Sequence, residues 1–211
     1  MYKALEIYQR DGVLPLIAAL SDRIHSAIIR RKFNYPDGFL IGRDTVWLTG
    51  KYAVIGKGLR IGRRCRIETI SRHNGHSFNP KLIIGSNVSM SDDVHIACST
   101  SVSIGDNVLL ASKIFITDHN HGEYKKDTFG ESLLPPNDRI LISEPVYIDK
   151  NVWIGEMVTI LPGVRIGEGS IIGSNSVVSK SIPRFCIAAG VPAKVIKRYS
   201  EETGIWERVY E

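Results

Sequence analysis

Aliphatic residues recur every six positions along much of this chain, and no other feature constrains its fold as strongly. The clearest unbroken run is Ile148, Ile154, Ile160, Ile166, Ile172 and Val178. Shorter runs come before it, from Ile84 to Ile96 and from Ile104 to Ile116. A short fixed period is typical of repeat proteins, and a period of six predicts a parallel β-helix. The alternation of an ordinary β-sandwich would not keep this spacing over so many repeats.

Each six-residue repeat predicts one flat side of a coil, and three sides close a triangle. The aliphatic residue should point inward because nothing else buries the axis of the coil. A second inward position falls two residues before each aliphatic residue, where small or β-branched side chains suit a narrow interior. Its members are Val152, Val158, Val164, Ser170 and Ser176. Corner asparagines should adopt a left-handed backbone, which Asn tolerates well. They are Asn87, Asn107, Asn151 and Asn175.

Length and composition limit the class of protein. The 211 residues suit one domain with appendages, and no apolar run is long enough for a transmembrane helix. The first residues lack a signal-peptide pattern, and the three cysteines have no CxxC spacing, so we expect free thiols in the cytoplasm. The net charge of +5 suits an acidic cofactor, an anionic glycan or a membrane surface. No nucleic-acid partner is expected.

The first 35 residues lie outside the repeat. Apolar residues at helical spacing, followed by Arg30, Arg31 and Lys32, predict an N-terminal helical segment over residues 1–35. One use of this helix is to pack on the first coil and its neighbour. The alternative is a peripheral contact with anionic lipid at the inner face of the membrane.

Residues 36–198 are predicted to form the β-helix. The repeat stops over 117–141, where Gly, Pro, Asp and Asn predict a long extruded loop, and it breaks more briefly over 72–81. Long loops on a regular scaffold usually carry function. Residues 199–211 are predicted to form a short C-terminal helix, so the fold class is all-β with helical ends.

Two histidines stand where the repeat gives way to the extruded loop, in the sequence Asp118-His119-Asn120-His121-Gly122. An imidazole titrates near neutral pH and is the usual general base for a hydroxyl group. The position therefore favours a catalytic role for at least one of the pair over an ordinary polar loop histidine.

Four motifs in this order resemble the hexapeptide-repeat O-acetyltransferases: ITDHNHG, VWIGEMVTILPGVRIG, GSNSVVSKSIP and AAGVPAKVIK. The resemblance covers about residues 41–198. It is closest to the O-acetyltransferases of O-antigen and capsular polysaccharides and to the maltose, galactoside and Nod-factor group. It implies a left-handed β-helix, a homotrimer, and acetyl-CoA bound between neighbouring subunits, with no metal required.

The resemblance also implies roles for individual residues. Counting without gaps from Ala111 places His121 on the family's catalytic histidine, with His119 second because it would match only a shortened loop. Residues expected to contact acetyl-CoA are Trp153, Glu156, Ser174, Lys180, Lys194 and Lys197. Residues expected near the acceptor are Ser91, Asp92, Asp118 and Asn120. Ser91 replaces the family's acceptor-orienting Asn, so we expect the acceptor to be held differently here.

The sequence thus predicts an enzyme that transfers acetyl from acetyl-CoA to a sugar hydroxyl of a surface polysaccharide, capsule or O-antigen, including sialylated and other anionic glycans. His121 would act as general base in a direct attack on the thioester. The alternatives are an N-acetyltransferase acting on a nucleotide-linked amino sugar, a zinc enzyme similar to the γ-carbonic anhydrases, and a non-catalytic scaffold.

Overall fold

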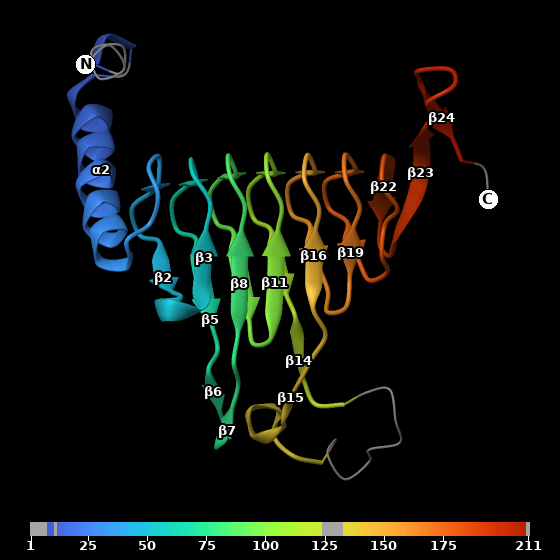
Figure 1. Ribbon diagram of the computed structural model, residues 1–211, viewed down its shortest axis with the longest axis horizontal. Helices are drawn as coiled ribbons and strands as arrows, with labels where there is room; N and C mark the ends of the chain where they lie inside the picture. The colour runs from blue at the N-terminus through green and yellow to red at the C-terminus, as the bar shows by residue number, and fades with distance from the viewer. Residues whose placement is uncertain (1–7, 11, 124–132, 210–211) are drawn as a thin grey trace.

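The computed structural model describes residues 8–10, 12–123 and 133–209 (Figure 1). Most of the chain winds into a three-sided prism whose sides are parallel sheets, and the predicted left-handed parallel β-helix is confirmed. Sheet 1 contains β1 (Leu40–Ile41), β4 (Arg60–Ile61), β9 (Ser89–Met90), β12 (Leu109–Leu110), β17 (Trp153–Ile154), β20 (Ile171–Ile172) and β22 (Cys186–Gly190).

The other two sides follow the same register. Sheet 2 contains β2 (Val46–Leu48), β5 (Arg66–Thr69), β10 (His95–Cys98), β13 (Phe115–Thr117), β18 (Thr159–Ile160) and β21 (Val177–Val178). Sheet 3 contains β3 (Ala53–Ile55), β8 (Lys81–Ile84), β11 (Ser101–Ile104), β16 (Val146–Ile148) and β19 (Arg165–Ile166). A short 3-10 turn, η1 (Gly50–Tyr52), precedes β3.

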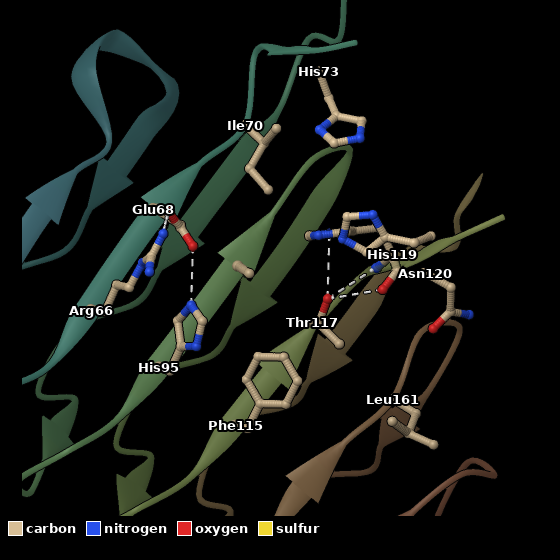
Figure 2. A pocket seen from close by; sticks show the side chains of 12 residues that line it. Arg66, Glu68, Ile70, His73, His95, Phe115, Thr117, His119, Asn120 and Leu161 are labelled. Atoms are coloured by element: carbon tan, nitrogen blue, oxygen red, sulfur yellow. Dashed lines mark hydrogen bonds and ion pairs between the residues drawn. The ribbon is translucent and has the colours of Figure 1, made fainter. Parts of the chain in front are cut away.

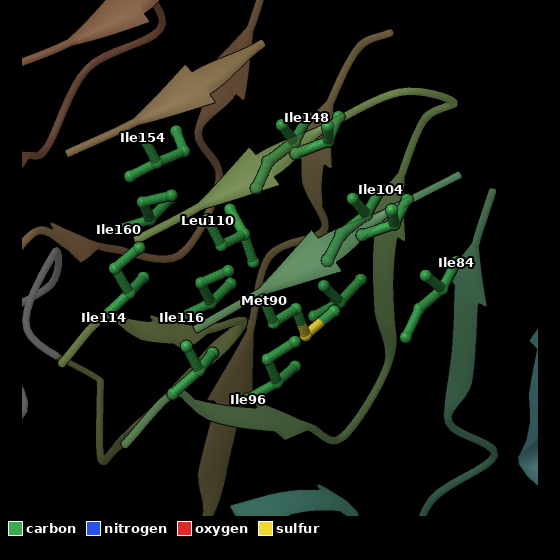
Figure 3. Close-up of a cluster of buried hydrophobic side chains, with 14 of the residues drawn as sticks. Ile84, Met90, Ile96, Ile104, Leu110, Ile114, Ile116, Ile148, Ile154 and Ile160 are labelled. Atoms are coloured by element: carbon green, nitrogen blue, oxygen red, sulfur yellow. The ribbon is translucent and has the colours of Figure 1, made fainter. Parts of the chain in front are cut away.

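The six-residue repeat builds the core as predicted. Equivalent aliphatic residues stack directly on one another, for example Ile96 on Ile116 and Ile116 on Ile160. All of them are buried in one continuous cluster along the axis (Figure 3). The second inward position is buried too, and its two serines are hydrogen-bonded. The Oγ of Ser170 donates to the carbonyl of Pro183 at 2.7 Å, and that of Ser176 to the carbonyl of Gly173 at 2.6 Å.

The corner asparagines adopt the expected left-handed backbone, with φ between 57° and 61°. They also bond along the prism. The Nδ2 of Asn87 donates to Asn107 Oδ1, and the Nδ2 of Asn107 donates to Asn151 Oδ1, each at 3.2 Å. The corners are therefore held by side chains as well as by backbone conformation.

The helix α2 (Val13–Phe33) lies within the predicted helical segment 1–35 and across the N-terminal end of the prism (Figure 1). Residues 1–7 and 11 of that segment lie outside the described residues. Ser26 joins it to the first coil, because its Oγ accepts from the backbone N–H of Ile41 at 2.9 Å. Asp22 binds Arg43 and Arg63 of the first two coils. Among the described residues, no helix is long and apolar enough to cross a membrane. The proposed division of the chain at residues 35 and 198 stays a prediction.

The predicted C-terminal helix over 199–211 is wrong. The chain turns back after β22 into β23 (Ala193–Tyr199) and then β24 (Trp206–Arg208), both antiparallel. The last parallel strand of a solenoid exposes unpaired backbone groups, and this hairpin pairs them. Tyr199 and Trp206 pack ring against ring at 5.5 Å, which joins the two strands further.

Two segments leave the prism at the same corner, the one that follows sheet 2 (Figure 1). The first, expected to be a loop, is a hairpin of β6 (Arg72–His73) and β7 (His76–Ser77). The second is the predicted extruded loop, of which β14 (His119–His121), the 3-10 turn η2 (Pro136–Asp138) and β15 (Leu141–Ser143) are described. β14 and β15 pair antiparallel, so the chain returns beside the point where it left.

Candidate functional site

A groove of about 720 Å³ lies on the outer face of sheet 2 where these two segments project. Its walls come from β5, β10 and β13, from the start of β14, and from the β6–β7 hairpin (Figure 2). The lining residues are Arg66, Glu68, Ile70, His73, His95, Ala97, Phe115, Thr117, His119, Asn120, His121 and Leu161. Three predicted site residues, His119, Asn120 and His121, are therefore together in one groove.

Asp118 is fully buried beneath this groove, at the point where β13 ends. Its carboxylate accepts the backbone N–H groups of Ser99 at 2.8 Å and of Thr100 and Ser101 at 2.7 Å each. Burial alone would raise the pKa of Asp118, but hydrogen bonds from His119 and from these N–H groups outweigh it and lower the pKa. Asp118 thus stabilises the corner of the prism through buried hydrogen bonds and does not line the groove.

His119 is held by this carboxylate. Its Nδ1 lies 2.9 Å from Asp118 Oδ1 and 3.3 Å from Thr117 Oγ1, and its side chain is 8% exposed. An ionised carboxylate can only accept, so its partner Nδ1 carries the proton and Nε2 is the acceptor in the neutral ring. His119 therefore has a fixed tautomer and little freedom to move.

His121 has the same tautomer from a different partner. Its Nδ1 lies 3.1 Å from the carbonyl oxygen of Pro136 in η2. A carbonyl only accepts, so Nδ1 donates and Nε2 is left as the acceptor. A ring held at one nitrogen by a backbone carbonyl, with the other nitrogen basic, is the arrangement that a general base requires.

The β6–β7 hairpin supplies a part of the site where the sequence predicted only a loop. The ring of His73 lies 5.3 Å from that of His121 at 80°, edge to face, and its Nε2 is buried with no hydrogen-bond partner. The next residue, Asn74, donates from Nδ2 to the carbonyl of Asp138 at 2.7 Å. This bond anchors η2, the turn whose Pro136 carbonyl holds His121.

The wall away from His119 and His121 carries a short chain of charged and polar groups. Arg66 donates to Glu68 at 2.8 Å, and Glu68 lies 3.1 Å from His95 Nε2. Burial alone would raise the pKa of Glu68, but the bonds from Arg66 and His95 outweigh it and lower the pKa. Phe115 packs against the His95 ring at 5.0 Å and forms an apolar floor. Such a wall offers both hydrogen-bonding groups and an aromatic ring to a ligand.

Most residues predicted to contact acetyl-CoA lie elsewhere on the prism. Trp153 is on the outer face of sheet 1 and is 50% exposed. Strand pairing puts it in one row with Ile171, Ile187 and Lys197, so Trp153 and Lys197 share a face. Lys194 is also on β23.

The other predicted cofactor residues are at corners. Glu156 and Ser174 lie at the corner between sheets 1 and 2, where the N–H of Glu156 donates to Ser174 Oγ at 3.1 Å. Lys180 is exposed just after β21, on the corner from which the histidines also project, two coils farther along the axis. Within one chain, then, Trp153 and the groove are on different sides of the prism.

Ser91 and Asp92 are not brought to the groove. They follow β9 at the corner between sheets 1 and 2, the opposite edge of sheet 2 from the histidines. The carboxylate of Asp92 accepts the N–H of Arg63 at 2.8 Å and the guanidinium of Arg64 at 3.3 Å. Within the described residues, no three His, Cys, Asp or Glu side chains gather as a metal site.

Comparison with known proteins places the chain among acyl-transferring relatives. The model of the bacterial transferase hexapeptide (six repeats) family matches residues 145–180. WbbJ of Escherichia coli (strain K12), assigned as an O-acetyl transferase of lipopolysaccharide biosynthesis, is 51% identical over 128 residues, which are 60% of this chain and 65% of WbbJ. The galactoside O-acetyltransferase of the same organism is 39% identical over 128 residues, 59% of this chain and 58% of that enzyme. The chain thus spans less than two thirds of either protein.

Solved structures agree on the fold. A maltose O-acetyltransferase from Clostridium difficile 630 superposes with a TM-score of 0.54 at 27% identity, over 87% of this chain and 89% of that one. A variant of AntD, an N-acyltransferase from Bacillus cereus in complex with dTDP-4-amino-4,6-dideoxyglucose and coenzyme A, reaches 0.66 at 20% identity, over 85% and 91% of the two chains. The predicted resemblance to hexapeptide-repeat acetyltransferases is confirmed.

Proposed function

We propose that this protein transfers acetyl from acetyl-CoA to a hydroxyl of a surface-polysaccharide sugar, with His121 as general base. The observation that carries the proposal is the position of the His121 ring, which lines the groove and is held at Nδ1 by the Pro136 carbonyl, so that Nε2 is its accepting nitrogen. The similarity to WbbJ and to the galactoside enzyme supports the reaction class and the kind of acceptor.

The proposed chemistry needs no covalent enzyme intermediate. Nε2 of His121 takes the proton from the sugar hydroxyl as the hydroxyl oxygen attacks the thioester carbonyl carbon. The tetrahedral oxyanion collapses and the carbon–sulfur bond breaks. The imidazolium returns its proton to the leaving CoA sulfur, so base and proton are restored. Holding both substrates in one groove supplies much of the rate.

We assign His119 and Asp118 to positioning. Asp118 is buried and fixes the His119 ring, which leaves His119 second to His121 as a base. Asn120 lines the groove and is proposed to contact the acceptor, together with Arg66 and Phe115. An aromatic floor beside charged groups suits a sugar ring, which presents apolar C–H faces and polar hydroxyls.

We propose a homotrimer because one chain holds only part of the site. The histidines face outward from the edge of sheet 2, whereas Trp153 and Lys197 face outward from sheet 1. Placing sheet 1 of one copy against the sheet 2 groove of the next brings the two parts together, and three such contacts close a ring. Acetyl-CoA would then run from His121 toward Lys180 and Lys197, with Trp153, Glu156, Ser174 and Lys194 along its path. Ser91 and Asp92 are at the edge of the same contact.

The reaction is proposed to occur in the cytoplasm, since the three cysteines are free and buried as a reducing compartment allows. Contact with the membrane is proposed through α2 and can be tested separately from catalysis.

The experiment is thiol release from acetyl-CoA with a panel of acceptors: neutral oligosaccharides, oligosialic acid, uronic-acid polymers and amino-sugar nucleotides. We expect release with one glycan class, and a loss of roughly 100-fold or more in kcat for His121→Ala, the usual contribution of a general base. If His121→Ala kept near-normal turnover and His119→Ala lost it, His119 would be the general base and the assignment of His121 would be wrong.

Other outcomes of the panel identify other functions. Release only with an amino-sugar nucleotide would show N-acetylation, the chemistry of the structurally similar AntD. No release and no CoA binding would favour a scaffold, and bound zinc in the purified protein would favour the metal-enzyme alternative.

A further inference from the structure

The helix α2 carries an apolar stripe on its exposed side. Its members, which we call the α2 stripe, are Val13, Ile17, Leu20, Ile24 and Ile28. At about 100° per residue they share one face of the helix. The opposite face holds Ala18, Ser26 and Ile29, which pack toward the first coil. The two members nearest the C-terminal end of the helix, Ile24 and Ile28, are 65% and 62% exposed. A contiguous apolar face of this kind on a soluble scaffold usually marks an interaction site.

The charges around the stripe have one sign. Arg23, Arg31 and Lys32 are exposed on the described helix, and Arg31 lies in line with the stripe at its C-terminal end. The one acid of the described helix, Asp22, points the other way and binds Arg43 and Arg63 of the prism. An apolar stripe flanked by cations fits a surface that is apolar inside and anionic outside, which is the chemistry of an anionic bilayer.

The position of α2 suits such a surface. The helix lies across the end of the prism (Figure 1). Its face with Ala18 and Ser26 is buried toward the first coil, so the exposed stripe on the opposite face points away from the coils. In the proposed trimer, which this step takes from the proposed function, the prisms lie side by side. Their three helices then share one end of the assembly, and neighbouring copies lie beside the stripes and not over them. Three weak contacts on one plane bind much more tightly than one.

We propose that the α2 stripe docks the protein on an anionic lipid surface, with its aliphatic side chains at the boundary of headgroups and acyl chains and its cations among the headgroups. The groove begins on the second coil from this end and extends over two more coils. At the usual spacing of strands, its walls therefore lie about 5–15 Å from the first coil. A glycan acceptor attached to a lipid in the same membrane would reach it within a few sugar units.

The test is flotation of the full-length protein with vesicles of phosphatidylcholine alone or mixed with phosphatidylglycerol. We expect binding to the mixed vesicles that falls with added salt. Ile24→Glu with Ile28→Glu should reduce the bound fraction at least tenfold, because two carboxylates would have to enter the interface. Arg31→Gln with Lys32→Gln should weaken binding to the mixed vesicles about fivefold per charge removed.

The matched control is Ile205→Glu, an equally exposed isoleucine (59%) at the other end of the molecule, which should float like the unmodified protein. Acetyl transfer to a soluble acceptor should be the same in all these variants, so a failure of docking is distinguishable from a failure of the proposed catalysis. Equal binding to neutral and mixed vesicles, or none to either, would overturn the proposal. A second result would also overturn it: the protein has twice the mass of a trimer in solution, and Ile24→Glu with Ile28→Glu reduces it to a trimer. A second copy of the protein would then cover the stripe.

Discussion

His119 and His121 are two positions apart on β14, and their Nδ1 atoms meet acceptors of different kinds. The partner of His119 is a buried carboxylate, which belongs to the corner of the prism as much as to the site. The partner of His121 is a carbonyl on the projecting turn η2. Both rings present Nε2 as the basic nitrogen, but only His121 depends on a part of the chain that lies outside the prism.

Asp118 gives a prediction at this scale. Asp118→Asn should lower the free energy of unfolding by about 2–4 kcal/mol, since an amide cannot accept all the N–H groups that the buried carboxylate accepts. The folded-state pKa of Asp118 is below its ordinary value. Its contribution is therefore complete above about pH 4 and is lost as the pH falls through the lower folded-state value.

Urea unfolding of both proteins between pH 7 and pH 3 measures this difference. The difference in unfolding free energy between the unmodified protein and Asp118→Asn should be largest near neutral pH and smaller in acid. Asp37→Asn, at a side chain 85% exposed, is the control and should leave stability nearly unchanged. A gap that stays constant down to pH 3 would contradict the assignment of the lowered pKa to the folded carboxylate.

At the scale of elements, the site is made where two projecting segments meet. Both leave the prism from the corner after sheet 2, two coils apart, and Asn74 joins them through the carbonyl of Asp138. The β6–β7 hairpin therefore reaches His121 in two ways: indirectly through η2, and directly through the ring of His73.

Asn74→Gly should therefore lower kcat several-fold with little change in KM for acetyl-CoA, because the His121 ring would be less well oriented. Asn74 has φ 49°, so glycine keeps the backbone and removes only the amide. Asn107→Gly, at φ 57° on a corner away from the groove, is the matched control. Equal kinetic effects of both substitutions would show that the hairpin has no special role.

The sequence predicts the prism well because each repeat carries its own inward residue. Counting the repeats also gives the side of the coil on which each residue lies. The repeat breaks after Ile67 and after Ile116, both on the second side of a coil, so the two excursions had to leave from the same corner. What spacing could not show was that Asn74 reaches Asp138 or that Pro136 faces His121, because these contacts depend on the path of irregular chain. The C-terminal segment was mispredicted because its strand pairing depends on an open sheet edge and not on local composition.

At the scale of the whole molecule, the division of the site between faces leads to a test by mixing. His121→Ala and Trp153→Ala should each be nearly inactive alone. If the two residues meet across subunits, trimers assembled from both variants contain sites in which both residues are intact. Random assembly from equal amounts should restore about a quarter of the unmodified activity. Co-refolding the two variants and assaying thiol release measures this, and no recovery in mixed trimers would place both residues in one subunit's site.

The stacking of coils also limits how the length of this protein can change. Trp153 and Lys197 are three strands apart on one face, about 14 Å at the usual spacing of strands. Inserting one hexapeptide between them would move every later residue onto the next side of the prism, so the two residues would no longer share a face. Only a whole turn of three hexapeptides would restore the order, and it would lengthen the span by one strand spacing. The distance between these two residues of the proposed cofactor path therefore changes in fixed steps, and gradual variation in length is possible only in the two segments that project from the corner.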